Sequence, residues 1–195
     1  MDLCSICQLI NNLCYCHLIP ELDTRTKVSF ILHNSELGRA SNTGYLAHRS
    51  LINSDMRVFG DGKDWRQWQQ MNLADYETLI LSSRSSHVVS PKFMQAIEKP
   101  IHLVVPDGNW RQGHSMTRKL AFQFGLRTVS LPQMPSSYYP LRRRHNEQNG
   151  VSTIEAVAKA LDLFGEGDAS AKLSEIFKTM LDRWLCVGHP EGSKH

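Results

Sequence analysis

The sequence predicts an α/β protein built on a mainly parallel sheet. Short apolar runs that are typical of buried strands alternate with segments whose apolar residues recur at helical spacing. This alternation is characteristic of helices layered on a parallel sheet. Four closely spaced cysteines precede the first strand and predict a small N-terminal appendage. At 195 residues, the chain is long enough for one such domain with a sizeable core.

Each expected element rests on a local pattern. Strands are predicted at 27–32, 56–59, 78–81, 101–105 and 126–131, where short runs of apolar residues occur. Helices are predicted at 42–52, 64–70, 90–97, 111–124, 152–164 and 171–187. Ser152 and Glu155 have the spacing of a capping box. Residues 132–151 form a long loop rich in proline and arginine, and loops of that length are commonly functional or mobile.

The N-terminal cysteines predict a metal site. Their spacing is C-x2-C-x6-C-x-C, formed by Cys4, Cys7, Cys14 and Cys16. Four close thiolates suit a tetrahedral zinc ion. Two disulfides, free thiols and an iron–sulfur cluster are the alternatives. Disulfides need an oxidising compartment, and no secretory signal precedes the cluster, while nothing else in the sequence suggests electron transfer. We therefore expect a zinc knuckle at 1–20, an α/β domain at 21–195 and a cytoplasmic protein.

Charge is modest overall but clustered. The formal net charge is +3 and the isoelectric point is about 8.6, which alone does not indicate nucleic-acid binding. Three basic groups stand out, made up of Arg142, Arg143, Arg144 and His145, then Arg111, Arg118 and Lys119, then Arg39, His48 and Arg49. Such clusters are often only solvated surface, but here they flank polar loops and favour a phosphate-bearing partner. No apolar stretch is long enough to cross a bilayer, so no membrane partner is expected.

A carboxylate follows the apolar run at 101–105. The residues after it are Asp107-Gly108-Asn109-Trp110, and the next segment has helical periodicity. Ligands of open α/β sheets bind beyond the carboxyl ends of the strands, which makes Asp107 a candidate catalytic residue. Trp110 offers a flat face for stacking, or it could be a core residue that anchors the following helix. The same tetrapeptide is also an ordinary turn with a capping residue, so both interpretations remain open.

These segments together resemble the DTW-domain family of tRNA-uridine aminocarboxypropyltransferases. The resemblance spans most of the chain, in the order of the cysteine cluster, His33 and Glu36, Asn42-Thr43-Gly44-Tyr45-Leu46, Asp107-Gly108-Asn109-Trp110, Tyr138 to Leu141-Arg142, and Ser152-Thr153-Ile154-Glu155-Ala156. One position departs from the family pattern, because Asn109 stands where the motif has threonine. Asparagine keeps a hydrogen-bonding side chain there but lacks the β-branch.

The resemblance implies a fold, a reaction and a site. The fold is SPOUT-like, with a stretch near the C-terminus that threads a knot and helps to bind S-adenosylmethionine. The reaction moves the 3-amino-3-carboxypropyl group of that donor to N3 of a uridine in tRNA and releases methylthioadenosine. Asp107 is then the general base that accepts the N3 proton, with Trp110 beside it.

Polar residues at predicted helix starts are candidates for binding the donor, because helix N-termini hold anionic groups. With the motif residues, the candidates are Gly108, Asn109, Asn42, Thr43, Ser152, Thr153 and Glu155. Plain helix capping explains the last five equally well. The candidates for tRNA phosphate contacts are Arg142, Arg143, Arg144, Arg111, Arg118 and Arg39.

Three rival functions remain open at this point. An RNA methyltransferase would use the same donor but release S-adenosylhomocysteine. A non-catalytic zinc-containing RNA-binding protein would not depend on Asp107. A small-molecule hydrolase is the weakest, since the G-x-S-x-G nucleophile motif is missing from the sequence. The modified uridine, the choice of tRNA and the oligomeric state are not determined by these patterns.

Overall fold

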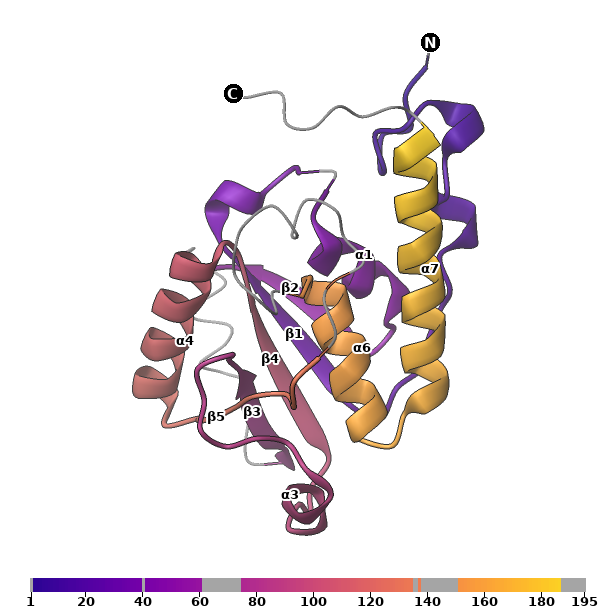
Figure 1. Ribbon diagram of the computed structural model, residues 1–195. Coiled ribbons are helices and arrows are strands. Elements are labelled where there is room, and N and C mark those ends of the chain that lie inside the picture. The colour runs from indigo at the N-terminus through magenta and orange to yellow at the C-terminus, as the bar shows by residue number, and fades with distance from the viewer. Residues whose placement is uncertain (1, 40, 61–74, 135–136, 138–150, 187–195) are drawn as a thin grey trace.

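A five-stranded sheet forms the middle of the molecule, with helices on both faces (Figure 1). This computed structural model describes residues 2–39, 41–60, 75–134, 137 and 151–186. The strands are β1 (Lys27–Leu32), β2 (Ser54–Val58), β3 (Glu77–Leu81), β4 (Ile101–Asp107) and β5 (Arg127–Val129). Their order is β2-β1-β4-β3-β5, and all neighbouring pairs are parallel, as the alternating pattern predicts.

Strand β4 continues two residues beyond its expected end at 105, through Pro106 to Asp107. Proline lacks the backbone N–H that donates to a neighbouring strand, so it is rare where a strand pairs on both sides. Pairing of β4 with β3 ends at Val104, opposite Ile80, so only β1 lies beside Pro106. The extra residues therefore disrupt no ladder with β3, and they bring Asp107 level with Leu32, the last residue of β1.

The helices begin and end at local signals. They are α1 (Thr43–Ser50), α3 (Pro91–Gln95), α4 (Trp110–Phe124), α6 (Thr153–Leu163) and α7 (Gly167–Cys186). Helix α4 ends at Gly125, whose φ of 63° is left-handed and suits glycine. Helix α7 begins four residues before its predicted start at 171. The helix expected at 64–70 lies outside the described residues.

Two apolar layers enclose the sheet. Helix α4 packs on one face, where Met116 and Leu120 meet Ile31, Ile80 and Val104. Helices α1, α6 and α7 cover the other face (Figure 1). The larger core lies there, and it also contains Cys7, Leu9 and Tyr15 from the N-terminal segment. The N-terminal segment thus shares its core with the sheet, although the division of the chain at residue 20 stays a prediction.

Two further expectations concern the whole chain. The knot near the C-terminus stays a prediction, because the path into α6 passes through residues 138–150, which lie outside the described part. Within the described residues, no helix combines the length and apolarity that a membrane span requires.

Candidate functional site

Asp107 lies where three helices meet the carboxyl edge of the sheet. Its backbone oxygen accepts a hydrogen bond from His33 N at 2.9 Å, which joins the ends of β4 and β1. The residue is 5% exposed. Asn42 Nδ2 donates to Oδ2 at 2.9 Å, and Thr153 Oγ1 donates to Oδ1 at 2.6 Å. The carboxylate therefore connects the first turns of α1 and α6 to the sheet.

Gly44 permits this arrangement. It is the second residue of α1, and a Cβ atom built there would clash with Asp107 Oδ2. Asn42 is the N-cap of the same helix, since its Oδ1 accepts from Tyr45 N at 2.7 Å. One asparagine thus caps α1 and holds the aspartate. The first turn of α1 is shaped around the Asp107 carboxylate.

A cavity of about 490 Å³ lies beyond the carboxyl ends of β3, β4 and β5. Its walls come from the strand ends at Leu81 and Val105, the segment 130–134, the start of α4 and the start of α6. Thr153 belongs to this lining, whereas Asp107 does not. Thr153 therefore links the buried carboxylate to the cavity through its hydroxyl group.

The tryptophan of the motif faces the cavity. Trp110 is the first residue of α4, and its ring lies 6.2 Å from that of His114, one turn further on. Asn109 caps the helix by accepting from Gln112 N at 3.0 Å, while Asn109 N donates to Gln112 Oε1 at 2.8 Å. Asparagine thus performs the capping for which threonine is also suited, so the departure from the family pattern preserves the helix start.

The structure divides the candidate donor-binding residues into two groups. Four of them line the cavity: Gly108, Asn109, Ser152 and Thr153. The other three, Asn42, Thr43 and Glu155, do not line it, and they belong to the starts of α1 and α6. Glu155 Oε2 accepts from Ser152 N at 2.7 Å and from Ser137 Oγ at 2.6 Å, and the first of these is the capping contact predicted from the sequence.

The candidate RNA-binding arginines also differ in their surroundings. Arg39 forms an ion pair with Glu36 at 3.1 Å, which offsets its charge. Arg111 and Arg118 are exposed on α4. Arg142, Arg143 and Arg144 lie outside the described residues. Of these candidates, only the α4 pair therefore presents cations without an ion pair to any described residue.

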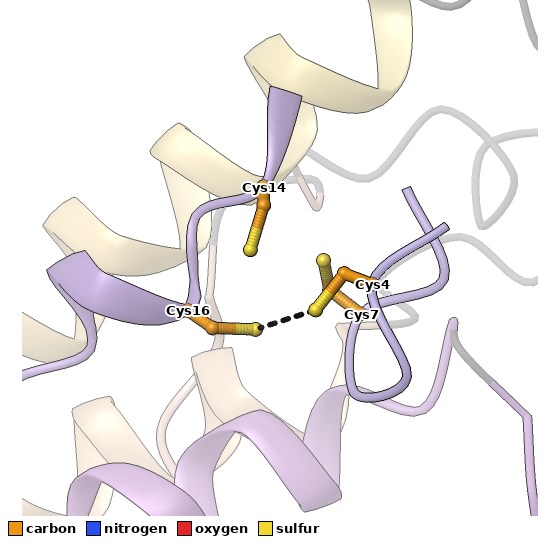
Figure 2. A group of neighbouring side chains, drawn as sticks. All are labelled: Cys4, Cys7, Cys14 and Cys16. Atoms are coloured by element: carbon orange, nitrogen blue, oxygen red, sulfur yellow. Dashed lines mark hydrogen bonds between the residues drawn. The ribbon is translucent and has the colours of Figure 1, made fainter. Parts of the chain in front are cut away.

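The four N-terminal cysteines converge (Figure 2). Cys4 and Cys7 come from one turn, and Cys14 and Cys16 follow η1 (Asn11–Leu13) and begin η2 (Cys16–Leu18). Their Sγ atoms all lie within 4.8 Å of one another, and Cys4 Sγ is 3.8 Å from Cys16 Sγ. A Zn–S bond of about 2.3 Å places tetrahedral sulfurs about 3.8 Å apart. The cluster has the ligands and the spacing that one tetrahedral ion requires.

Local hydrogen bonds and burial act differently on these thiols. The backbone N–H groups of Cys7 and Ile6 lower the pKa of Cys4 to about 6. Burial raises the pKa values of Cys7 and Cys16. Among the described residues, no disulfide joins any of the five cysteines, and Cys186 is exposed at the end of α7 rather than part of the cluster. Cys4 therefore favours the thiolate form more strongly than Cys7 or Cys16 does in the absence of metal.

Some cavity residues were not identified from the sequence. Ser82 and Ser83 follow β3, and Gln133 and Met134 follow β5 by several residues. Their position after parallel strands was a usable signal, since such ends meet at one edge of a sheet. His114 is harder to predict, because nothing in its neighbours distinguishes it from an ordinary helix residue.

Comparisons with known proteins identify a shared fold and a family. A solved structure, that of the SAM-dependent rRNA:acp-transferase Tsr3 from Vulcanisaeta distributa, superposes with a TM-score of 0.51. The match covers 82% of this chain and 78% of that chain, at 18% sequence identity, and therefore shows a shared fold. The DTW domain matches residues 1–185, which include both the cysteine cluster and the Asp107 segment. The chain therefore belongs to the DTW domain family.

Proposed function

We propose that the protein transfers the 3-amino-3-carboxypropyl group of S-adenosylmethionine to N3 of a uridine in tRNA and releases methylthioadenosine. The observation that carries the proposal is the cavity at the carboxyl edge, which is lined by the motif residues Gly108, Asn109 and Trp110. Family membership supports the same reaction class. The structural neighbour acts on rRNA, so tRNA as the acceptor is the finer part of this proposal.

The cavity suits the donor in size and character. Its volume of about 490 Å³ is within the range of small-molecule sites, which are mostly apolar with a few placed polar groups. Leu81, Val105 and Leu131 supply apolar walls, and Ser152 and Thr153 supply hydroxyl groups at the start of α6. We assign the donor to this cavity, with Trp110 beside either its adenine or the target base.

Bound S-adenosylmethionine supplies an electrophilic carbon whose bond to the positively charged sulfur breaks as N3 attacks. The protein has to orient that carbon and to accept the N3 proton. Thr153 lines the cavity, and its Oγ1 donates to Asp107 Oδ1 at 2.6 Å. In our proposal the N3 proton passes to the Thr153 oxygen while the Thr153 proton passes to Asp107. A buried carboxylate can act as the base in this way without itself lining the cavity.

The cysteine cluster has a structural role in this proposal. Four thiolates fill a tetrahedral zinc shell and leave no position for a substrate. The cluster lies within the family match and shares the main core, so we assign it to holding the N-terminal segment against the sheet. Reduced thiolates of this kind persist in the cytoplasm, which is also the compartment we propose for the reaction.

A product assay tests the proposed function. Purified protein is incubated with an unmodified tRNA transcript and S-adenosylmethionine labelled in the carboxypropyl carbons, and the digested nucleosides are analysed by mass. We expect 3-(3-amino-3-carboxypropyl)uridine in the tRNA and methylthioadenosine in solution. A methylated nucleoside with S-adenosylhomocysteine would identify a methyltransferase instead. Modification of rRNA but not of tRNA would keep the reaction and correct the acceptor.

A further inference from the structure

Helix α4 has an unusual outer surface. Its 15 residues include Arg111, Arg118 and Lys119 but no aspartate or glutamate. Phe122, near its end, is 91% exposed, the largest value among the exposed large apolar side chains of the described residues. Arg111 and Arg118 form no ion pair with a described residue, and Phe122 belongs to neither core cluster of the described residues. A partner with both charge and flat apolar faces would explain the two features together.

The two arginines and Phe122 occupy one stripe of the helix. They are separated by seven and four residues, spacings that return to the same side of an α-helix. Seven residues correspond to about 10.5 Å along the axis, and the next four add about 6 Å. The stripe therefore presents two cations and one aromatic ring in a line of about 16 Å. A polynucleotide strand offers phosphates and bases in such a line.

The stripe runs beside the cavity. Trp110, His114 and Thr117 lie on the adjoining side of α4 and line the cavity wall. Arg111 directly follows Trp110, so the stripe begins at the cavity and leads away from it towards Phe122. Lys119 lies on a different side, where its Nζ atom is 5.5 Å from the ring centroid of Phe59. Arg111 and Arg118 thus lie on the side of α4 next to the cavity, and Lys119 does not.

We propose that the outer stripe of α4, formed by Arg111, Arg118 and Phe122, is the docking surface for the RNA substrate. The two arginines bind backbone phosphates, and a base stacks on Phe122. The strand then leads to the cavity, where Trp110 lies. This inference rests on the proposed function for its choice of RNA as the partner. It adds the direction from which the RNA approaches and an aromatic contact outside the cavity.

Matched substitutions on α4 test the docking surface. Arg118→Gln and Arg111→Gln remove the stripe cations, and Lys119→Gln removes one charge from the other side of the same helix. Phe122→Ala is paired with Leu185→Ala, which removes an apolar side chain that is 65% exposed on α7. Binding to a fluorescent unmodified tRNA transcript is measured over a series of salt concentrations. Donor binding is measured by calorimetry, and product formation is measured for every variant.

We expect the double arginine variant to bind tRNA more weakly and to have a shallower salt dependence. The slope should decrease by about 0.7 to 0.9 for each arginine–phosphate ion pair that is removed. Phe122→Ala should weaken tRNA binding by about fivefold or more without changing the slope. Lys119→Gln and Leu185→Ala should bind tRNA almost as the unchanged protein does, and donor binding should change little in every variant.

Equal effects of Arg118→Gln and Lys119→Gln on tRNA binding, or unchanged tRNA binding by Phe122→Ala, would overturn the docking surface. Product formation by the unchanged protein would still leave the proposed reaction intact. Conversely, stripe-dependent tRNA binding without any aminocarboxypropyl product would support the surface and reject the reaction. Heparin, a polyanion without bases, serves as the control partner. Equally tight binding of heparin, with the same response to all the variants, would overturn RNA as the partner.

Discussion

At the scale of single residues, Asp107 differs from an exposed general base. It is 5% exposed and accepts hydrogen bonds from Asn42 and Thr153, so it holds two helix starts and contacts the cavity lining through Thr153. A purely positioning role and a role in proton transfer both fit these hydrogen bonds. The two roles predict different transfer rates when the basicity of Asp107 or the hydroxyl group of Thr153 is removed separately.

Asp107→Asn removes basicity and keeps the side-chain shape. We expect aminocarboxypropyl transfer to fall by about a hundred- to ten-thousand-fold, the usual cost of losing a general base. Donor binding should persist, because Asp107 does not line the cavity. Single-turnover rates at saturating tRNA measure the effect. A rate close to that of the unchanged protein would assign Asp107 to positioning alone.

Thr153→Val tests the hydroxyl link at nearly constant volume. The proposed proton path passes through Thr153 Oγ1, so transfer should fall by about a hundredfold or more, whereas Thr153→Ser should retain most of it. Thr78→Val is the matched control, because Thr78 lies in β3 outside the cavity lining and its hydroxyl has no hydrogen-bond partner among the described residues. Equal rates for the Val and Ser variants at position 153 would contradict the proton path.

At the scale of elements, the N-terminal segment and α7 depend on each other. The segment runs beside α7 in Figure 1, and Cys7, Leu9 and Tyr15 lie in the same core as Leu173 and Ile176. Burial raises the pKa of Tyr15, which keeps its hydroxyl group neutral within this core. A metal that orders the cysteine turns therefore also supports the face of the sheet that α6 and α7 cover.

Removing metal should destabilise the protein beyond its first 20 residues. We expect about one zinc per chain by elemental analysis. Chelation or Cys16→Ser should lower the melting temperature by about 5 °C or more, since a loss of about 2 kcal/mol shifts a chain of this size by about 2–4 °C per kcal/mol. Cys186→Ser is the control, because Cys186 is exposed and outside the cluster. An unchanged melting temperature after chelation would contradict a structural role for the metal.

At the scale of the whole molecule, the two layers bury a titratable group inside the sheet. His102 in β4 is fully buried, and its Nε2 atom lies 2.7 Å from Ser29 Oγ. Burial, with a smaller contribution from Lys27, lowers the pKa of His102 from 6.5 to about 4. Burial also lowers the pKa of His48. His102 therefore stays neutral in the folded protein at pH values where the unfolded chain protonates it, and the pKa of His48 moves in the same direction.

The protein should lose stability in mild acid. Above pH 6.5 His102 is neutral in both states, and the decrease in stability as pH falls from there to about 4 reflects proton uptake by the unfolded chain. Between about pH 7.5 and about pH 5, this single group should cost about 2 kcal/mol in urea unfolding. His102→Gln should reduce the dependence of the unfolding free energy on pH. The difference between the two proteins cancels the contribution of the other titrating groups. A resolved imidazole titration of His102 near pH 6.5 in the folded protein would contradict the prediction without any variant.

The sequence by itself determined the parts that depend on near neighbours. Alternating apolar runs and helical spacing predicted the α/β layers, and the Ser152–Glu155 spacing predicted the cap of α6. The four cysteines lie within 13 residues, so their meeting required only short loops. The position of Asp107 at a strand end followed from the apolar run before it. These features are local, so residues that are close in the sequence suffice to predict them.

Only the tertiary structure decided which distant residues share the site. Asn42 and Thr153 are 65 and 46 residues from Asp107, and nothing near them in sequence indicates that both contact its carboxylate. The order β2-β1-β4-β3-β5 places the end of β1 beside that of β4, and the packing of α1 and α6 on the same face brings their first turns to that edge. Strand order and helix packing depend on contacts between segments that are far apart in the sequence. The apolar period of one segment shows which face it buries but not which other segment it packs against.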